Sequence, residues 1–292
     1  MENTHNQYRI HVYSEYDVLK KVIMCQPQYM MIRDVINETQ KQYKNEGINI
    51  EKALKQYDQF VRTLKDHGVE VILLPYHKKY PEQVFTRDIG FVLGETIFVA
   101  DMKSQIRMGE DDVFKLWLED EDLSYYNIKG HEIEGGDVLI DRDCIYIGLS
   151  SRTKLEAVHH IELLLGKQFE IITIDFNEKY LHLDCVLNIV SEEVALIFPE
   201  ALRDEDLIKI KNKYDCIEVT KDEQFTLGTN VLCIGNKKIL SLPVNKQVNQ
   251  ELIKRGFEVI DVDINEIIKS GGSFRCCTLP IEREHHPQIK TN

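Results

Sequence analysis

Apolar residues in this chain come in short runs, separated by polar turns and by longer amphipathic segments. The first run, at residues 18–25, stops at Pro27, and a second run at residues 69–74 is closed by Pro75. Apolar runs of this length between turn signals are typical of buried strands. We therefore predict a strand at each of these two positions.

A helix is predicted between the two strands, over residues 46–67. Apolar side chains recur there at the three- and four-residue spacing of one helix face. They are Ile50, Leu54, Tyr57, Phe60, Val61 and Leu64. Gly68 follows and is suited to end the helix, because glycine readily adopts the left-handed conformation of a helix C-terminus. Residues 75–84 are polar and are predicted to form a loop.

From residue 85 onward, the pattern repeats itself. Each unit is predicted to contain two short strands joined by a turn, then a helix and a third strand. The predicted strand pairs are 89–93 with 96–99, 137–140 with 144–147, 185–190 with 194–198 and 230–234 with 239–242. The predicted helices lie near 153–165, 203–213 and 245–255, and the third strands at 169–174, 216–219 and 258–262.

The repeat has a nearly constant period. The strand pairs are headed by Asp88, Asp137, Asp184, Asn230 and Cys276, at steps of 49, 47, 46 and 46 residues. A fixed period of this size indicates a repeat or propeller architecture. The fifth unit begins at Cys276 and runs out of chain, so its missing strand, helix and strand are expected to come from residues 18–74. This predicts one closed α/β ring, a single domain over residues 1–292, without exposed sheet edges.

Composition and charge narrow the range of partners. The formal net charge is −13, which argues against nucleic acid or an anionic membrane, since both require a basic surface. The N-terminus is polar and leads into no apolar signal-peptide core, and no run approaches the ~18 apolar residues that span a bilayer. Seven cysteines without C-x-x-C spacing suggest free thiols in a reducing compartment, so a cytoplasmic location is expected. A homodimer is assumed from the size of the chain and its soluble class.

Chemically reactive side chains occur at the heads of the repeats. In a closed ring these positions face one axis, so they are expected to meet in one pocket. The segments concerned are Phe85-Thr86-Arg87-Asp88, Glu134-Gly135-Gly136-Asp137, His182-Leu183-Asp184, Thr229-Asn230 and Cys276. Cys276 and His182 suit a nucleophile–base pair, and Glu134 could orient the imidazole or share its proton. Asp88 and Asp184 suit a planar cation that donates hydrogen bonds from more than one edge. The spacing of these residues suggests no metal site.

Each of these features also has a purely structural explanation. Asp88 and Asp137 can cap turns, His182 can be a hydrogen-bonded core histidine, and glycines 135–136 can open a hairpin. The cation Arg275 precedes the thiol of Cys276, and a nearby positive charge favours a thiolate, but buried cysteines are often simple core residues. A common position in all five repeats is hard to explain by turn chemistry alone. The set as a whole favours a site.

Four ordered motifs carry a resemblance to a known superfamily. They are Phe-Thr-Arg-Asp at 85–88, Glu-Gly-Gly-Asp at 134–137, His-Leu-Asp at 182–184 and Gly-Gly-x-x-x-Cys-x-Thr at 271–278. Together they resemble the guanidine-modifying enzymes of the pentein superfamily, over residues 18–283. These include arginine deiminase, dimethylarginine dimethylaminohydrolase and the amidinotransferases. The resemblance implies a five-bladed α/β propeller and a covalent thiouronium mechanism that needs no cofactor and no metal.

The resemblance also implies catalytic roles. Cys276 holds the place of the family's nucleophile, and Cys277 is then only its neighbour. His182 resembles the general acid and base, and Glu134 resembles its carboxylate partner at the guanidinium.

Substrate-binding roles are implied for five further residues. Asp88 and Asp184 resemble the pair that grips the guanidinium nitrogens, with Phe85 near the guanidinium face. Arg107 and Arg152 match the arginines that bind the substrate carboxylate. Arg107 could instead be a solvated surface residue, and Arg152 could belong to the first turn of the helix that follows.

The choice among the relatives stays open at this stage. Arginine deiminases carry an inserted helical domain before the Phe-Thr-Arg-Asp motif, whereas here only 84 residues precede Phe85. Many dimethylarginine hydrolases lack counterparts of Arg87 and Asp184. Because Asp184 on a terminal nitrogen would leave little room for two methyl groups, an unmethylated or lightly substituted guanidino acid is expected, with dimethylarginine as an alternative.

Other members of the superfamily remain as alternatives. An amidinotransferase would use an amine in place of water, and an arginine dihydrolase would release ornithine. The ribosome-binding factor of the same fold lacks the Cys–His pair, so Cys276 and His182 argue against it. The expected partner is a small cationic guanidino compound.

Overall fold

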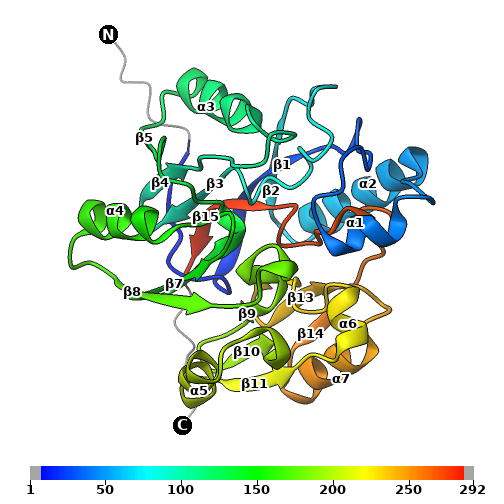
Figure 1. Cartoon of the computed structure of the whole chain (residues 1–292). Helices are drawn as coiled ribbons and strands as arrows, with labels where there is room; N and C mark the ends of the chain where they lie inside the picture. The colour runs from blue at the N-terminus through cyan, green and yellow to red at the C-terminus, as the bar shows by residue number, and fades with distance from the viewer. Residues whose placement is uncertain (1–7, 286–292) are drawn as a thin grey trace.

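The computed structural model describes residues 8–285, and its strands form five three-stranded sheets of one design. In each sheet the middle strand is antiparallel to the first strand and parallel to the third. Parallel neighbours need a crossover connection, which explains why a helix lies between the middle and third strands of every unit. The sheets are arranged around a common axis and the helices lie on the outside (Figure 1).

Four of the five blades follow one another along the chain. The first has β3 (Gly90–Leu93), β4 (Thr96–Val99), α3 (Glu110–Asp120) and β5 (Tyr125–Asn127), and the second has β6 (Val138–Asp141), β7 (Cys144–Leu149), α4 (Leu155–Leu165) and β8 (Glu170–Asp175). The third has β9 (Leu187–Ile189), β10 (Val194–Ile197), α5 (Asp204–Lys213) and β11 (Asp215–Glu218). The fourth has β12 (Leu232–Gly235), β13 (Lys238–Ser241), α7 (Lys246–Lys254) and β14 (Glu258–Asp261), with α6 (Lys221–Phe225) before it.

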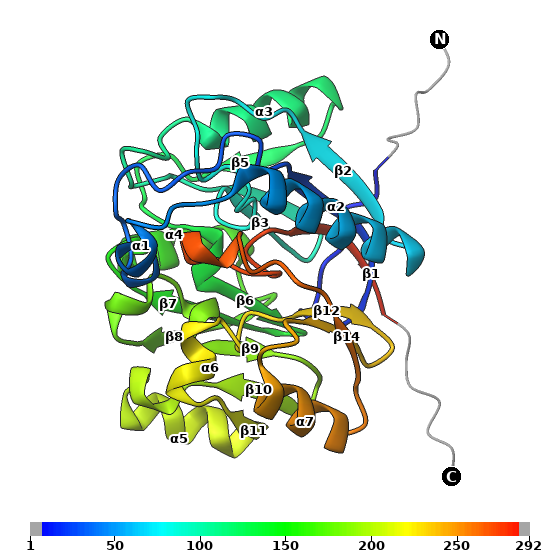
Figure 2. The same ribbon diagram turned by 90° about the vertical axis from the view of Figure 1, so that its right-hand side faces the viewer.

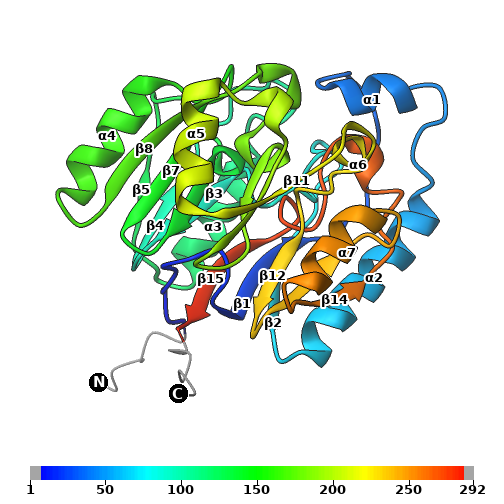
Figure 3. The ribbon, with the colours of Figure 1, turned by 90° about the horizontal axis from the view of Figure 1, so that it is seen from below.

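The fifth blade is built from both ends of the chain. Its strands are β15 (Leu279–Glu284), β1 (Val18–Cys25) and β2 (Glu70–Leu74), and α2 (Ile50–Asp66) connects the last two. Strand β1 is antiparallel to β15, with Ile23 opposite Leu279, and it is parallel to β2. Figures 2 and 3 show the blue and red ends of the chain side by side in this blade. The predicted closure of a five-bladed α/β propeller by the terminal segments is confirmed.

Most element bounds agree with the sequence prediction to within a few residues. The helix expected at 46–67 begins later, at Ile50, because the side chain of Asn49 accepts a hydrogen bond from the Lys52 N–H group and caps the helix.

Some elements were not predicted from the sequence. No range was given for α3 or β5, and the helices α1 (Glu38–Tyr43) and α6 were missed. Each of the latter two is only about one turn long, so neither presents a repeating apolar face. That all 292 residues form a single domain stays a prediction.

No helix among residues 8–285 combines the length and the apolar character needed to cross a membrane.

Helix α2 anchors the segment that leads to Cys276. The rings of Phe60 on α2 and Phe274 meet edge to face, with centroids 5.1 Å apart, and both side chains are buried. Aromatic pairs in this geometry stabilise a core beyond the area they bury. The helix of the fifth blade therefore supports the loop that precedes β15.

The Phe60→Ala variant is expected to lower the free energy of unfolding by about 3–5 kcal/mol, because it leaves a cavity beneath Phe274. Urea unfolding followed by circular dichroism would measure the change. The matched control is Leu163→Ala, whose side chain is 82% exposed on α4, with an expected change within about 0.5 kcal/mol. Equal effects of the two substitutions would contradict the packing described here.

Candidate active site

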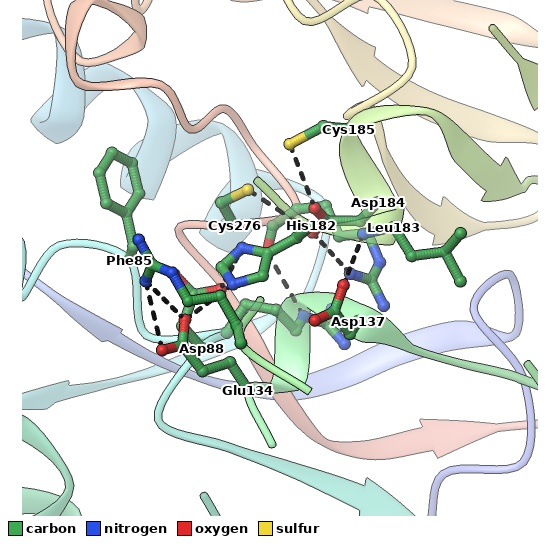
Figure 4. Close-up of polar contacts among 12 residues, drawn as sticks. Phe85, Asp88, Glu134, Asp137, His182, Leu183, Asp184, Cys185 and Cys276 are labelled. Carbon is green, nitrogen blue, oxygen red and sulfur yellow. Dashed lines mark hydrogen bonds and ion pairs between the residues drawn. The ribbon is translucent and has the colours of Figure 1, made fainter. Parts of the chain in front are cut away.

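The residues that precede the first strand of each blade meet at the centre of the ring. Asp88 precedes β3, Glu134 precedes β6, His182 precedes β9, Asn230 precedes β12 and Cys276 precedes β15. A closed ring directs equivalent positions of all blades toward its axis. The expected convergence of the repeat heads is therefore present (Figure 4).

A small pocket of about 10 Å³ opens onto this cluster. It is lined by Ile36, Asn37, Glu82, Phe85, Asp88, Arg107, Leu181, His182, Ser270, Gly271, Gly272 and Cys276. Of the eight predicted site residues, five line the pocket, whereas Glu134, Arg152 and Asp184 lie behind its wall. The predicted residues thus form an inner layer that lines the pocket and an outer layer that lies behind it.

His182 lies between two carboxylates. Its Nε2 atom donates a hydrogen bond of 2.8 Å to Glu134 Oε2, and its Nδ1 atom lies 3.5 Å from Asp88 Oδ1. Burial alone would lower the pKa of His182, but Asp88, the hydrogen bond to Glu134 and the charge of Asp137 together raise it to about 10. The imidazole is therefore protonated at neutral pH and carries a proton that it can donate.

Glu134 stays ionised although it is fully buried. Burial works to raise its pKa, but the hydrogen bond from His182 and the charge of Arg152 lower the pKa to about 2. Arg152 Nη1 lies 3.2 Å from Glu134 Oε2, and its side chain is only 8% exposed. Arg152 precedes α4, which begins at Leu155, so it does not belong to the first turn of that helix.

The Cys276 thiol faces a different carboxylate. Its Sγ atom donates to Asp184 Oδ2 at 3.5 Å, and its backbone N–H donates to Asn230 Oδ1 at 3.1 Å. Among the described residues, no hydrogen bond joins Cys276 to His182, although both line the same pocket. A substrate atom placed in the pocket could contact both groups.

Arg275 stabilises Asp184 rather than the thiol beside it in sequence. Its guanidinium donates to Asp184 Oδ2 at 2.7 Å, to Glu15 Oε1 at 3.0 Å and to the Val138 carbonyl at 2.7 Å. The positive charge is therefore shared by two buried carboxylates. The expected influence of Arg275 on Cys276 acts through Asp184.

Arg107 is a buried residue, and the alternative of a solvated surface arginine is wrong. Its guanidinium donates to Asp88 Oδ2, to Glu110 Oε2 and to the Phe85 carbonyl. Only 1% of the residue is exposed. Burial raises the pKa of Glu110 to about 8 against the opposing effect of Arg107. Because every side-chain nitrogen of Arg107 already has an acceptor, its role toward a substrate carboxylate stays a prediction.

Two glycines allow the close packing of the pocket wall. A Cβ atom on Gly272 would lie 2.4 Å from the Phe85 ring, and one on Gly136 would lie 2.7 Å from the His182 ring. Neither contact is possible for a real side chain. The glycines of the sequence motifs therefore allow Phe85 and His182 to lie directly against the backbone.

Sequence analysis missed several residues that build the site. Glu82 accepts hydrogen bonds from Gln40 Nε2 at 2.8 Å and from Ser270 Oγ, and burial raises its pKa to about 7. Asn37 donates to the Ser270 carbonyl at 2.9 Å, which joins the segment before α1 to the pocket. No motif or period marks these positions. Asn230 was recognised as a repeat head, but its role in holding the Cys276 backbone was not predicted.

Donor atoms of Asp88, Glu134 and His182 lie within 4.8 Å of one another, a grouping that could hold a metal ion. However, Arg107 and Arg152 already place cations against the two carboxylates. The pKa of His182, raised to about 10 chiefly by Asp88 and Glu134 against the effect of burial, keeps a proton on each ring nitrogen at neutral pH. A protonated imidazole offers no lone pair to a metal ion.

The comparisons with known proteins agree with this geometry. The fold and the repeat-head site define the chain as a member of the guanidine-modifying pentein superfamily. The sequence profile described as N,N dimethylarginine dimethylhydrolase, eukaryotic, matches residues 26–283, and the chain belongs to this family. The family resemblance and the five-bladed fold predicted from the motifs are thus confirmed.

Individual relatives come from several organisms. The chain is 49% identical to the uncharacterized protein YkgA of Bacillus subtilis (strain 168), over 95% of this chain and 97% of that one. It is 26% identical to the N(G),N(G)-dimethylarginine dimethylaminohydrolase of Mycobacterium tuberculosis, over 80% and 77% of the two chains. Among solved structures, it superposes on the product-bound N-terminal domain of ArgZ, an arginine dihydrolase of cyanobacteria, with a TM-score of 0.83 and 25% identity. That match covers 91% of this chain and 98% of the ArgZ domain.

Proposed function

We propose that this protein hydrolyses a C–N bond of the guanidino group in a small arginine-like substrate, through a covalent intermediate on Cys276. The observation that carries the proposal is a pocket lined by a thiol, a protonated imidazole and a carboxylate with one oxygen atom that accepts no hydrogen bond from the described residues. Membership of the family supports the same chemistry. No cofactor takes part in the proposed reaction.

Binding of the guanidinium involves the two aspartates and Phe85. Asp88 Oδ1 is buried and makes no hydrogen bond to any residue between 8 and 285, so it can accept one from a guanidinium N–H group. Asp184 would approach the cation from the side of Cys276. Charge-assisted hydrogen bonds to carboxylates are among the strongest available to a guanidinium. The Phe85 ring, against Gly272, would lie near the face of the cation.

The first chemical step forms a thiouronium. The Cys276 thiolate attacks the guanidinium carbon and forms a C–S bond, while the positive charge faces Asp88, Asp184 and Glu134. The C–N bond then breaks, and the departing nitrogen leaves as ammonia or an amine with the proton of His182. Glu134 supports this transfer because its hydrogen bond orients the imidazole.

The second step uses water. Neutral His182 takes a proton from a water molecule, whose oxygen bonds to the thiouronium carbon. The C–S bond breaks, the Cys276 thiolate is regenerated and a ureido product leaves. A dihydrolase would repeat the hydrolysis and release ornithine, an alternative favoured by the similarity to the ArgZ domain over 91% of the chain.

Arginine or a lightly substituted guanidino acid is the proposed substrate. A terminal guanidinium nitrogen that donates to Asp184, whose Oδ2 atom lies 3.5 Å from Cys276 Sγ, would have little room for two methyl groups. The roles of Arg107 and Arg152 at the substrate carboxylate, a homodimeric state and a cytoplasmic location stay predictions.

Incubation of the purified protein with arginine, dimethylarginine and agmatine in separate reactions tests the proposal. Ureido product and ornithine are both assayed, with Cys276→Ser as the control. A ureido product from arginine that is lost in the variant supports a hydrolase, whereas ornithine favours the dihydrolase. Product only when an amine is added would identify an amidinotransferase and overturn the proposed hydrolysis.

The Asp184→Ala variant is expected to have a kcat/KM for arginine about 10- to 100-fold lower than the natural sequence. A loss of this size corresponds to the free energy of one or two charge-assisted hydrogen bonds between Asp184 and the substrate. Asp184→Asn should act in the same direction while it retains an acceptor for Arg275. Steady-state assays would measure both variants. The control is Asp215→Ala, which removes an exposed carboxylate paired with Arg255 and should leave turnover unchanged. A gain in arginine turnover by Asp184→Ala would contradict the proposed contact.

A further inference from the structure

Two thiols share one buried carboxylate in this site. Cys276 Sγ donates to Asp184 Oδ2 at 3.5 Å, and Cys185 Sγ lies 3.6 Å from Asp184 Oδ1. Figure 4 shows both sulfur atoms directed at the Asp184 carboxylate, that of Cys185 from the segment before β9 and that of Cys276 from the segment before β15. Cys185 has no part in the proposed hydrolysis.

The backbones that carry the two thiols are also held together. The Asn230 side chain accepts from the Cys276 N–H group at 3.1 Å and donates to the Asp184 carbonyl at 3.2 Å. The carbonyl of Cys185 accepts a hydrogen bond of 2.7 Å from Thr229. A single amide side chain therefore spans the gap between the two chain segments. A disulfide between the two residues requires their Cα atoms to lie about 4.4–6.8 Å apart.

The two thiols differ in their surroundings. Cys276 lines the pocket and Cys185 does not, although both residues are buried, at 3% and 2% exposed. The interaction with Cys276, followed by burial, raises the pKa of Cys185 well above its usual value. Cys185 is thus suited to remain a neutral thiol until its neighbour has been oxidised.

We propose that Cys276 is a site of reversible oxidation by peroxides and that Cys185 is its resolving thiol. The proposal rests on the reactive thiolate of the proposed function. The Cys276 thiolate attacks the peroxide oxygen and becomes a sulfenic acid, and hydroxide leaves. The Cys185 sulfur then attacks the sulfenic sulfur, a Cys185–Cys276 disulfide forms, and the sulfenic oxygen leaves as water. Overall, two thiols are oxidised and one hydrogen peroxide is reduced to two waters.

Cys277 is a poorer partner despite its place in the sequence. A disulfide between consecutive residues distorts the peptide bond that joins them, since bridged Cα atoms are normally about 4.4–6.8 Å apart. The Cys277 side chain is also fully buried among core residues of the fifth blade. The Cys185–Cys276 bridge should therefore form in preference to the Cys276–Cys277 bridge.

The disulfide would have two consequences. It removes the nucleophile from the pocket, so hydrolysis stops. It also prevents further oxidation of Cys276 to the sulfinic acid, which ordinary thiol reductants do not reverse. Inhibition by peroxide is thus reversible while Cys185 is present.

Peptide mass mapping of the full-length protein tests the inference. The protein is treated with hydrogen peroxide, free thiols are blocked, and the digest is analysed with and without dithiothreitol. We expect a Cys185–Cys276 cross-linked peptide that is two hydrogens lighter than its reduced parts, and activity that returns with dithiothreitol. In Cys185→Ser, Cys276 should gain two oxygens and its activity loss should not reverse. Cys277→Ser is the matched control and should behave like the natural sequence.

Several outcomes would overturn the inference. They are a Cys276–Cys277 bridge, a Cys276 that does not react with peroxide, and equal recovery of activity in Cys185→Ser and in the natural sequence. Mapping of the disulfide requires no substrate. If the proposed hydrolysis is wrong, the substrate assays will show it, and the disulfide mapping can still be interpreted without them.

Discussion

Replacement of Cys276 by serine is expected to lower kcat for the guanidino substrate by at least about 10³-fold, because a serine hydroxyl is a far weaker nucleophile than a thiolate in the same position. Substrate binding should be retained, because Asp88 and Phe85 are untouched. Rapid acid quenching followed by mass spectrometry should show a covalent adduct on Cys276 in the natural sequence and none in the variant.

The adjacent cysteine provides the control for this experiment. Cys277→Ser changes a buried thiol that faces the core rather than the pocket, so it should retain the adduct and most of the turnover. Thermal unfolding of both variants checks that any loss of activity is not a loss of fold. If Cys276→Ser kept a tenth or more of the natural kcat, a nucleophilic role for Cys276 could not stand.

The fold could be predicted because the pattern of strands and helices repeats along the sequence at a nearly constant period. The near-constant steps between repeat heads identified five units, and the truncated unit at Cys276 showed where the N-terminal strand must pair. The structure confirms this pairing, because Ile23 on β1 lies opposite Leu279 on β15. Local boundaries followed from ordinary signals, such as the run that ends at Pro27. The short helices α1 and α6 were missed because one turn contains too few residues to show a period.

For the site, the sequence predicted which residues meet but not which partners each of them binds. Repeat heads indicated which residues converge, and all eight predicted residues lie in one contiguous cluster. Their partners were not predictable, because a buried ion pair depends on tertiary distances that no spacing encodes. Arg275 illustrates this: it is adjacent to Cys276 in sequence, yet its guanidinium binds Asp184 and Glu15. Asn37 and Glu82 line the pocket without any sequence signal.

Charge pairing explains why so many ionisable groups can be buried together. Three of the buried carboxylates at the centre have an arginine beside them: Arg107 for Asp88, Arg152 for Glu134 and Arg275 for Asp184. A buried charge without a partner is strongly destabilising, whereas a paired one is tolerated. The arginines therefore give three buried carboxylates around the pocket a partner of opposite charge.

Substitution of His182 by glutamine is expected to lower kcat by about 10²- to 10⁴-fold, the usual contribution of general acid–base catalysis. Glutamine keeps a donor toward Glu134 but has no proton to give to the leaving nitrogen. An isothiourea analogue of the substrate, whose thiolate leaves without protonation, should therefore lose less activity in the variant than arginine does. Steady-state kinetics with both substrates would measure this difference. An equal loss with both substrates would contradict the acid role.

The pH dependence provides a second test of His182. Its pKa in the folded protein is about 10, above the value near 6.5 of an unperturbed histidine. The protonated ring therefore stabilises the fold fully below pH ~6.5, and this stabilisation is lost as the pH rises through the folded pKa. For the same reason, kcat of the natural sequence should fall as the pH approaches about 10, because the acid form disappears. His182→Gln should lack this descending limb, and a limb of the same shape in both proteins would assign it to another group.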